Sequence, residues 1–465
     1  MIILMLAFVV GIACAAYAEV QNVKVSGDIA AYTISQHDFG FTKQGPRNKT
    51  AIATIARLRV DADLTDNVMV TVRLLNERYW GQAGALYALG EDEDLAGNDT
   101  AIDLDLAYVT LKEFLYSPLT LMVGRQELHY GNEMIIGDPD TNALTTSYSG
   151  FGNTYFGNSA LSARKAFDAI RAVLDYDPLV VDLVMAKIRE GWEDSTDDHY
   201  ALKENDDTNL YGINAAYKID ANTSAEAYWW TKRTQRKNFV EPQPTRTDVV
   251  HTVGARIGKT TTKKNVDLTS SLEAAMQFGR YNDGTRDDNL KSIGAYALEG
   301  ALTAGFKSAK YTPAVTLLGA IFSGKKDPAS YDNTNEKFRG WDPMFENQKF
   351  GDIANQMLPQ TNIRVIGGIA TMKPAEDVIL KGEYYAYWAD RKYNNGDIVE
   401  SLTGEEVMMR DEKFIGQEVD LSVVYDYTED VQFGLLYGMV FAGPALDGRN
   451  DNMPSEVIGS MKVTF

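Results

Sequence analysis

Apolar and polar residues alternate with a period of two along much of the chain. In residues 54–64 the even positions are mostly apolar, whereas Arg57, Arg59 and Asp61 occupy odd positions. Because successive side chains of a β-strand point to opposite faces, this pattern predicts a strand with one apolar and one charged face. After a tight turn at residues 65–67 the pattern repeats. In residues 101–110 the expected outward positions are Ile102, Leu104, Leu106 and Tyr108, and the expected inward ones are Asp103 and Asp105.

Short and long connections between these segments follow one another in strict alternation. The expected short turns lie near residues 63–67, 114–118, 175–178, 220–222, 259–264, 307–310, 373–377 and 427–430. The expected long loops lie near residues 35–48, 81–100, 129–161, 190–208, 234–247, 281–289, 323–360, 390–412 and 443–454. These seventeen connections join eighteen antiparallel strands and leave both chain ends on the short-turn side. The sequence therefore predicts an all-β fold, a transmembrane antiparallel barrel with short periplasmic turns and long extracellular loops.

Residues 160–174 allow a second interpretation. Leu161, Phe167, Ile170 and Leu174 fit one side of an amphipathic helix. We favour a strand over residues 166–176, in which Ile170 points outward and Arg171 inward. Asp168 shares the parity of Ile170, so an inward Asp168 requires a bulge or a late strand start.

The N-terminal segment has the features of an export signal. Residues 2–13 are apolar and precede Ala16-Tyr17-Ala18, an A-x-A cleavage pattern, so we expect a signal peptide over 1–18 and one barrel domain over 19–465. A lipoprotein acylation site at Cys14 is a weaker alternative. Cys14 is the only cysteine, so cleavage after Ala18 leaves a mature chain without disulfides or cysteine-based sites.

Composition excludes several classes of protein. The chain has 45 Lys and Arg against 65 Asp and Glu, a net charge of −20, which argues against nucleic-acid binding. Beyond the first eighteen positions, no run of about 20 apolar residues predicts a membrane-spanning helix. Hydrophobic residues make up 45% of the chain, which argues against disorder.

Aromatic residues collect near the ends of the predicted strands, as in the girdles of membrane barrels. They are Tyr79, Trp80, Tyr116, Tyr217, Trp229, Trp230, Tyr384, Tyr385, Trp388, Tyr425, Tyr427 and Tyr437. The chain ends in an alternating segment with a terminal Phe465, which is similar to the signal that outer-membrane barrels present to their insertion machinery.

Several motifs point to one family. Gly124-Arg125-Gln126-Glu127-Leu128, with Tyr130 and Gly131 after it, resembles the G-R-Q-E-L-x-Y-G segment of the alginate-export family of outer-membrane porins. Further segments similar to the family follow in order at residues 166–171, 341–345, 351–352 and 415–421. The resemblance implies an eighteen-stranded barrel, which agrees with the strand count above. The chain departs from the family at Glu346-Asn347-Gln348, where the family loop usually carries a Pro and a His.

The inward charged residues are the candidate lining of the pore. They are Arg57, Arg59, Asp61, Arg73, Asp103, Asp105, Arg125, Glu127, Asp168, Arg171, Glu418 and Asp420. Arginine donates two parallel hydrogen bonds to a carboxylate or phosphate, and the resemblance implies that such arginines form a path for a polyanionic sugar chain. The other interpretation is that these charges pair across strands and brace the wall.

We expect a channel for passive passage of hydrophilic solutes, with sugar acids or an exported anionic polysaccharide among the candidates. The net charge of −20 disfavours a polyanion unless the lumen is locally basic. The alternative is a plugged barrel that anchors a surface layer or a partner protein. Expected partners are the lipid bilayer, lipopolysaccharide, the solutes and the insertion machinery.

Catalysis and metal binding have weaker support. A barrel hydrolase would need a base from His37, His129, His199 or His251, and no G-x-S-x-G motif accompanies them. Calcium in the extracellular loops is a further hypothesis, because Asp138, Asp140 and Asn142, and the acidic run 91–94, supply oxygen ligands.

Overall fold

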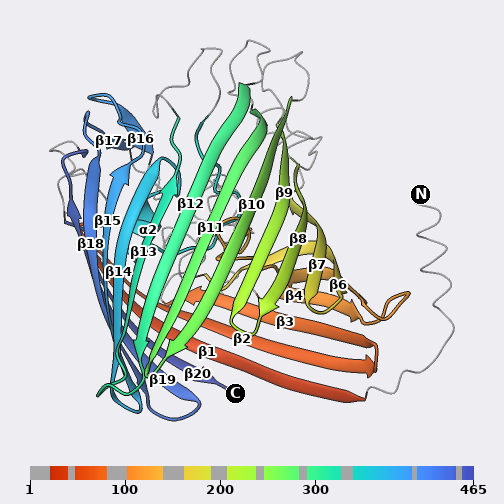
Figure 1. The fold of residues 1–465 in the computed structure, drawn as a ribbon. Helices are drawn as coiled ribbons and strands as arrows, with labels where there is room; N and C mark the ends of the chain where they lie inside the picture. The colour runs from red at the N-terminus through yellow and green to blue at the C-terminus, as the bar shows by residue number, and fades with distance from the viewer. Residues whose placement is uncertain are drawn as a thin grey trace, which may run out of the picture.

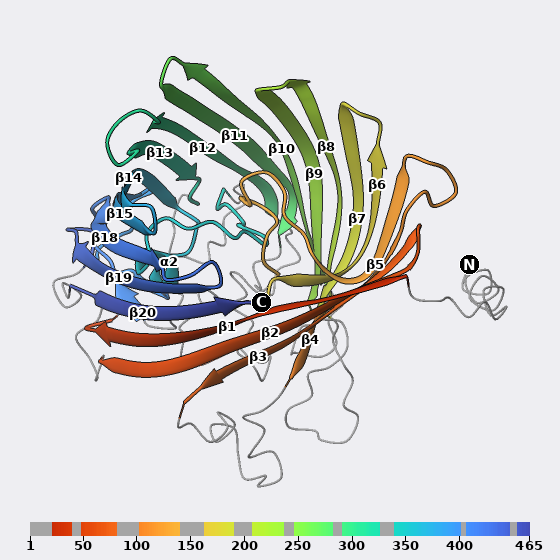
Figure 2. The same ribbon diagram turned by 90° about the horizontal axis from the view of Figure 1, so that it is seen from below.

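The chain forms a closed barrel of eighteen antiparallel strands in a computed structural model (Figure 1). The structure describes residues 21–39, 48–80, 102–139, 162–189, 207–236, 246–281, 291–325, 339–400, 406–446 and 453–465. Each strand pairs with its neighbour along the barrel wall, and β1 (Asn22–His37) also pairs with β20 (Ser455–Thr464), which closes the ring (Figure 2). The predicted fold and strand number are confirmed.

The remaining strands of the barrel follow in chain order. They are β2 (Lys49–Thr65), β3 (Val68–Tyr79), β4 (Asp103–Leu111), β5 (Leu119–Glu127), β6 (Ala166–Asp175), β7 (Leu179–Arg189), β8 (Thr208–Asp220), β9 (Thr223–Arg236), β10 (Arg246–Lys263), β11 (Val266–Tyr281), β12 (Lys291–Phe306), β13 (Ala314–Phe322), β14 (Ile363–Ala375), β15 (Val378–Ala389), β18 (Phe414–Asp426) and β19 (Val431–Ala442). A small separate hairpin joins β16 (Ile398–Glu400) to β17 (Glu406–Met408), and a short helix, α2 (Ala354–Met357), lies in the connection from β13 to β14.

The predicted alternation of connections is confirmed at every strand boundary. The stretch that also fitted a helix is strand β6, as favoured, because its neighbours β5 and β7 satisfy its backbone groups along the whole strand. The short turns share one rim with the C-terminal end, at the bottom of Figure 1. Among the described residues, no helix is long and apolar enough to cross a membrane.

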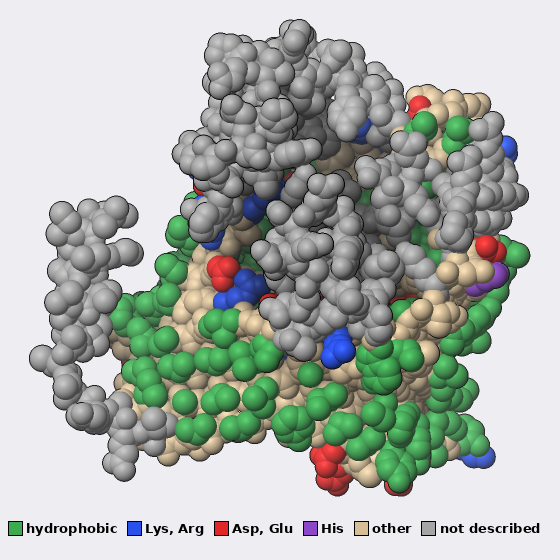
Figure 3. Space-filling view, turned by 180° about the vertical axis from the view of Figure 1, so that it is seen from behind, with side chains coloured by type: hydrophobic (Ala, Val, Ile, Leu, Met, Phe, Trp, Pro, Cys, Tyr) green, Lys and Arg blue, Asp and Glu red, His purple; other side chains and the backbone are tan. Residues whose placement is uncertain are grey.

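The strand pattern puts apolar side chains outside. In β11, Met276 and Phe278 are 69% and 42% exposed on the outer face, whereas Glu273 and Gln277 are almost fully buried inside. On the face shown in Figure 3, hydrophobic side chains form a band across the barrel wall, with charged side chains gathered above it and at its lower rim. This is the surface that a barrel presents to lipid.

Most of the described aromatic residues named above lie on this outer surface, but two do not. Trp229 and Tyr384 are 49% and 45% exposed, whereas their sequence neighbours Trp230 and Tyr385 are buried inside the barrel. Adjacent residues of a strand cannot both face lipid, so the girdle assignment was wrong for Trp230 and Tyr385.

A β-bulge in β4 reverses the faces on which the side chains of its second half lie, compared with the prediction. Arg73 of β3 pairs with Leu106, but Leu74 pairs with Leu104, so Asp105 is an extra residue in the ladder. Beyond the bulge the parity is reversed, and Tyr108 lies opposite Thr71 on the inner face. The outward assignment of Leu106 and Tyr108 was therefore wrong.

Two of the long connections fold into the barrel. Residues 128–138, after β5, and residues 339–362, before β14, lie inside the wall and meet through a parallel bridge between Ile136 and Phe345. Their buried apolar side chains pack against the inner faces of the strands and form one core. Its loop members are Leu128, Tyr130, Met134, Ile135, Ile136, Trp341, Met344, Phe345, Phe350, Ile353, Ala354 and Met357. The barrel is thus partly filled by its own connections.

Candidate functional site

The inward arginines of the first strands each contact a carboxylate. Arg57 binds Asp28 of β1 through two hydrogen bonds of 2.9 and 3.1 Å. Arg59 binds Asp61 two residues away on the same strand, again through two bonds, of 2.8 and 2.9 Å. Both guanidinium groups keep a quarter or more of their side-chain surface exposed, so they face water in the lumen. This wall presents closely paired charges of opposite sign.

Arg73 lies deeper and joins two more of the candidate residues. Its Nε donates to Asp105 and its Nη2 to Glu127, each at 2.5 Å. Only 9% of the Arg73 side chain is exposed, so it ties β3, β4 and β5 together. Burial of such a charge is tolerated because both carboxylates are within hydrogen-bonding distance. These three residues brace the wall.

Asp103 and Arg171 are paired as well, with partners that the sequence patterns did not single out. Asp103 binds Arg164, which also donates to Glu77 at 3.0 Å. Arg171 donates from Nε to Asp182 at 2.8 Å. In the sequence of β7, Asp182 is an acid at an inward position between apolar neighbours. That pattern could have identified it as a partner.

Asp168 does not face inward. The register between β5 and β6 runs without interruption, so neither the bulge nor the late start that an inward Asp168 required is present. Asp168 lies opposite Arg125, on the face of β6 that carries the exposed Ile170, and the two charged groups are 3.1 Å apart. Arg125 and Asp168 were expected to face inward, and this expectation was wrong. Side chains alternate between the two faces along β5 and β6 without interruption, which places both residues on the outer face.

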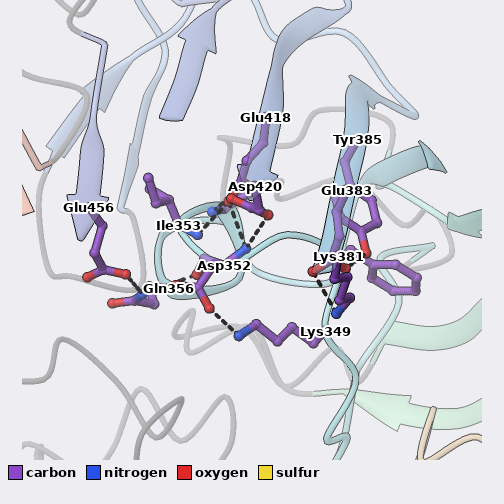
Figure 4. Close-up of polar contacts among 12 residues, drawn as sticks. Lys349, Asp352, Ile353, Gln356, Lys381, Glu383, Tyr385, Glu418, Asp420 and Glu456 are labelled. Atoms are coloured by element: carbon purple, nitrogen blue, oxygen red, sulfur yellow. Dashed lines mark hydrogen bonds and ion pairs between the residues drawn. The ribbon is translucent and has the colours of Figure 1, made fainter. Parts of the chain in front are cut away.

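Glu418 is fully buried and anchors the loop that carries α2 (Figure 4). Its carboxylate accepts hydrogen bonds from the backbone N–H groups of Asp352, Ile353 and Ala354, at 2.7, 2.6 and 2.8 Å. Asp420, two residues further along β18, accepts a second bond from the Asp352 N–H at 3.2 Å. Both carboxylates lie beneath the loop and are covered by it.

Other carboxylates of the wall hold the connection after β5 in the same manner. Glu226 accepts a bond from the Gly131 N–H at 3.1 Å, and Glu273 accepts one from the Asn132 N–H at 3.2 Å. Glu299 accepts from the Asn132 side chain at 3.4 Å. Sequence reasoning missed Glu226, Glu273 and Glu299, although each is a lone acid among small or apolar residues of a strand.

Lysines in the inward loop and on the wall beside it are paired too. Lys349 binds Asp352, and Lys232 of β9 lies 2.5 Å from Asp342. Burial lowers the pKa of Lys349, but the carboxylate of Asp352 outweighs burial, so the net pKa is raised and the ammonium stays charged.

The residues at the departure from the family motif bind the wall and the other loop. Gln348 donates to Glu299, and the Asn347 side chain donates to Glu133 at 2.6 Å. Glu346 accepts a bond from the Gln360 side chain at 2.9 Å. This segment is fixed by polar contacts in place of the usual Pro and His.

The calcium candidates divide between described and other residues. Asp138 is buried and bound by Lys165, whereas Asp140, Asn142 and the run 91–94 lie outside the described residues. In the part of the chain that the structure describes, no group of three or more potential metal ligands is found. The signal segment and His199 also lie outside the described residues.

A family model supports the assignment suggested by the motifs. The model described as Alginate export matches residues 23–459. The chain belongs to the Alginate export family. This barrel is an outer-membrane protein and a channel for solutes.

Solved structures share the fold of this Alginate export family member at low sequence identity. The crystal structure of Acinetobacter baumannii OccAB1 has 14% identity and a TM-score of 0.57, and the match covers 97% of this chain and 98% of that chain. Pseudomonas aeruginosa OccK8 (OprE) has 10% identity and a TM-score of 0.55, with coverage of 96% and 98%. Pseudomonas aeruginosa OpdK with vanillate has 12% identity and a TM-score of 0.55, with coverage of 96% and 100%. No curated protein matches the chain.

Proposed function

We propose that this channel passes small neutral and zwitterionic hydrophilic solutes by diffusion and does not conduct a long polyanion. The observation that carries the proposal is the pairing of the lumen arginines. Arg57 and Arg59 face the lumen with Asp28 and Asp61 bound to them. A wall of paired charges offers hydrogen bonds to sugars and zwitterions, but it has little net attraction for a chain of like charges.

The inward loops support a limit on solute size. Barrels of 16–18 strands leave an aqueous channel when nothing fills them. Here the two inward loops and their apolar core occupy part of the bore, and wall carboxylates hold them by backbone hydrogen bonds. A polysaccharide would have to pass beside these loops and their core. The proposal therefore favours short solutes over a polymer.

Planar bilayers and liposomes test the proposal directly. We expect the purified protein to form channels whose reversal potential in a salt gradient shows weak selectivity between K⁺ and Cl⁻. In liposome swelling we expect neutral monosaccharides to enter at least as fast as sugar acids of the same size. Strong anion selectivity, or saturable block by alginate oligomers from either side, would contradict the proposal.

Matched variants assign the selectivity to the paired wall. Asp28→Asn removes the partner of Arg57 and leaves a free cation, so the reversal potential should shift toward anions. Arg57→Gln removes the cation instead and should shift it toward cations. Two shifts of the same sign would mean that this pair does not line the path of the ions.

Two further predictions concern catalysis and calcium. We keep the absence of catalysis as a prediction, since the family matched here comprises channels. Calcium in the outer loops also stays a prediction, and equilibrium dialysis with radioactive Ca²⁺ would test it.

A further inference from the structure

Two arginines lie close together on the outer face of the barrel, one on β9 and one on β11. Val249 of β10 lies opposite Arg233 on one side and opposite Arg280 on the other, so all three share one face. Arg280 follows the exposed Phe278 in the alternation of β11, which identifies that face as the outer one. Both arginines are exposed.

Neither arginine has a carboxylate partner among the residues that the structure describes. Within the described ranges, no carboxylate lies in ion-pair distance of Arg233 or Arg280, unlike the lumen arginines, each of which binds an acid. The two Cα atoms lie two strand spacings apart, about 10 Å. One anionic headgroup could therefore contact both guanidinium groups, which form paired hydrogen bonds to phosphate.

An aromatic cluster lies directly below the arginines. Trp229, His251 and Phe278 contact one another, with ring centroids 5.0 to 6.2 Å apart. Thr231 Oγ1 and His251 Nδ1 are 2.9 Å apart, which fixes the imidazole on this face. Aromatic rings of this kind mark the boundary between the hydrocarbon and the headgroups.

Below the cluster the face is apolar. Met276 and Val253 are 69% and 40% exposed, and the exposed Leu272 and Ile257 continue the surface toward the short turns. From bottom to top the face is thus apolar, then aromatic, then cationic.

The height of the arginines agrees with the outer boundary of the membrane. Arg233 comes ten residues after the first residue of β9, and Arg280 fourteen after the first of β11. At about 3.3 Å per residue and a tilt of about 40°, these positions lie roughly 25 and 35 Å above the short turns. The apolar band of such barrels is about 25 Å tall, so both side chains reach the outer headgroup region.

We propose that Arg233 and Arg280, above the Trp229–His251–Phe278 cluster, bind the phosphorylated sugar headgroup of an outer-leaflet glycolipid of the lipopolysaccharide type. The phosphate contacts the guanidinium groups, and the acyl chains lie against the apolar face below. The site is on the lipid-facing wall, so it is independent of the solute path proposed above.

Binding of a defined glycolipid tests the proposal. The full-length protein in detergent is titrated with bisphosphorylated lipid A, and the bound fraction is measured by native mass spectrometry. We expect Arg233→Gln with Arg280→Gln to weaken binding at least about tenfold, since each cation near an anionic lipid surface contributes about 1 kcal/mol. Lys218→Gln with Lys259→Gln, the same charge change on exposed residues near the opposite rim, should leave binding unchanged.

Two further measurements separate the ligand sources. Lipid A without phosphates should bind about as weakly as the arginine variant, and inorganic phosphate at millimolar concentration should not displace the lipid. If the double variant does not fold, as judged by channel conductance, Arg280→Gln alone replaces it and should still weaken binding. The proposal is overturned if folded variants bind as the wild type does, if phosphate-free lipid binds equally well, or if free phosphate competes.

Discussion

Gly124 of β5 lies close to the backbone of β4. Its φ of +126° is a conformation that other residues rarely adopt, and a Cβ there would lie 2.1 Å from the carbonyl oxygen of Ala107. The backbone conformation therefore requires glycine at the first position of the family-like motif. Arg125 and Glu127 of the same motif have no part in this requirement.

Gly124→Ala should destabilise the folded barrel by about 1–3 kcal/mol or more, because the new methyl group meets backbone that has no room to move. Gly258→Ala is the matched control, since the nearest atoms to a Cβ there are 3.6 and 4.0 Å away. The folded fraction on an unheated gel and the unfolding temperature measure both. An equal loss of stability in the two variants would show that replacing any strand glycine has this effect, whether or not it lies close to a neighbouring backbone.

His129 is the titrating residue beside the inward connection. The Glu127 carboxylate, 3.9 Å from Nε2, raises the pKa of His129, burial opposes this, and Glu133, 2.9 Å from Nδ1, raises it further. The ion pairs stabilise the fold fully below about pH 6.5, the ordinary pKa of histidine. This stabilisation is lost as the pH rises through the higher pKa that His129 has in the folded state.

We therefore expect the His129 imidazole to remain protonated above pH 6.5 in the folded barrel. A titration of labelled histidine by NMR, assigned with His129→Gln, measures this. A folded pKa at or below about 6.5 would contradict the assigned partners.

At the level of elements, the inward loops and the strands stabilise one another. The loops have too few neighbours of their own to bury their apolar residues, so they pack on the inner wall, where Glu226, Glu273 and Glu418 accept their backbone N–H groups. Without these acceptors, buried N–H groups would lack partners at a cost of about 1–3 kcal/mol each. The lumen is shaped by acids that no solute contacts.

Glu418→Gln should loosen the loop around α2, because an amide oxygen is a weaker acceptor than a carboxylate for the three N–H groups it holds. The barrel should still assemble, and single-channel recordings should show larger and noisier conductance. Glu113→Gln, at the exposed turn after β4, is the control and should conduct as the wild type does. Unchanged conductance in Glu418→Gln would mean that the loop does not narrow the path.

At the scale of the whole molecule, the barrel depends on one seam between the first and the last strand. β1 and β20 pair over ten residues, and the Phe465 backbone exchanges two hydrogen bonds of 2.9 Å with Gly27. The Phe465 side chain is 58% exposed, and its ring lies over Gly27. The seam is therefore held by backbone, and the terminal ring adds little to it.

Phe465→Ala should leave refolding in detergent nearly unchanged but lower the amount of assembled barrel in cells severalfold, if the terminal aromatic serves as the insertion signal. Refolding yield and the folded fraction in isolated outer membranes measure the two effects. Equal loss in both would instead place the role of Phe465 in the seam. Phe433→Ala, an exposed aromatic on the adjacent β19, is the matched control.

Strand number, connection lengths and the apolar outer face follow from local sequence, because alternation and turn residues act within a few positions. The alternation of residues does not predict which face a side chain occupies beyond a bulge, so Leu106 and Tyr108 of β4 were assigned to the wrong face. Nor does it reveal partners distant in the chain. Asp28 comes beside Arg57 only when β1 pairs with β2, and the loop amides reach Glu418 only when the loop folds into the barrel. These tertiary contacts turn a series of inward charges into neutral pairs and covered anchors.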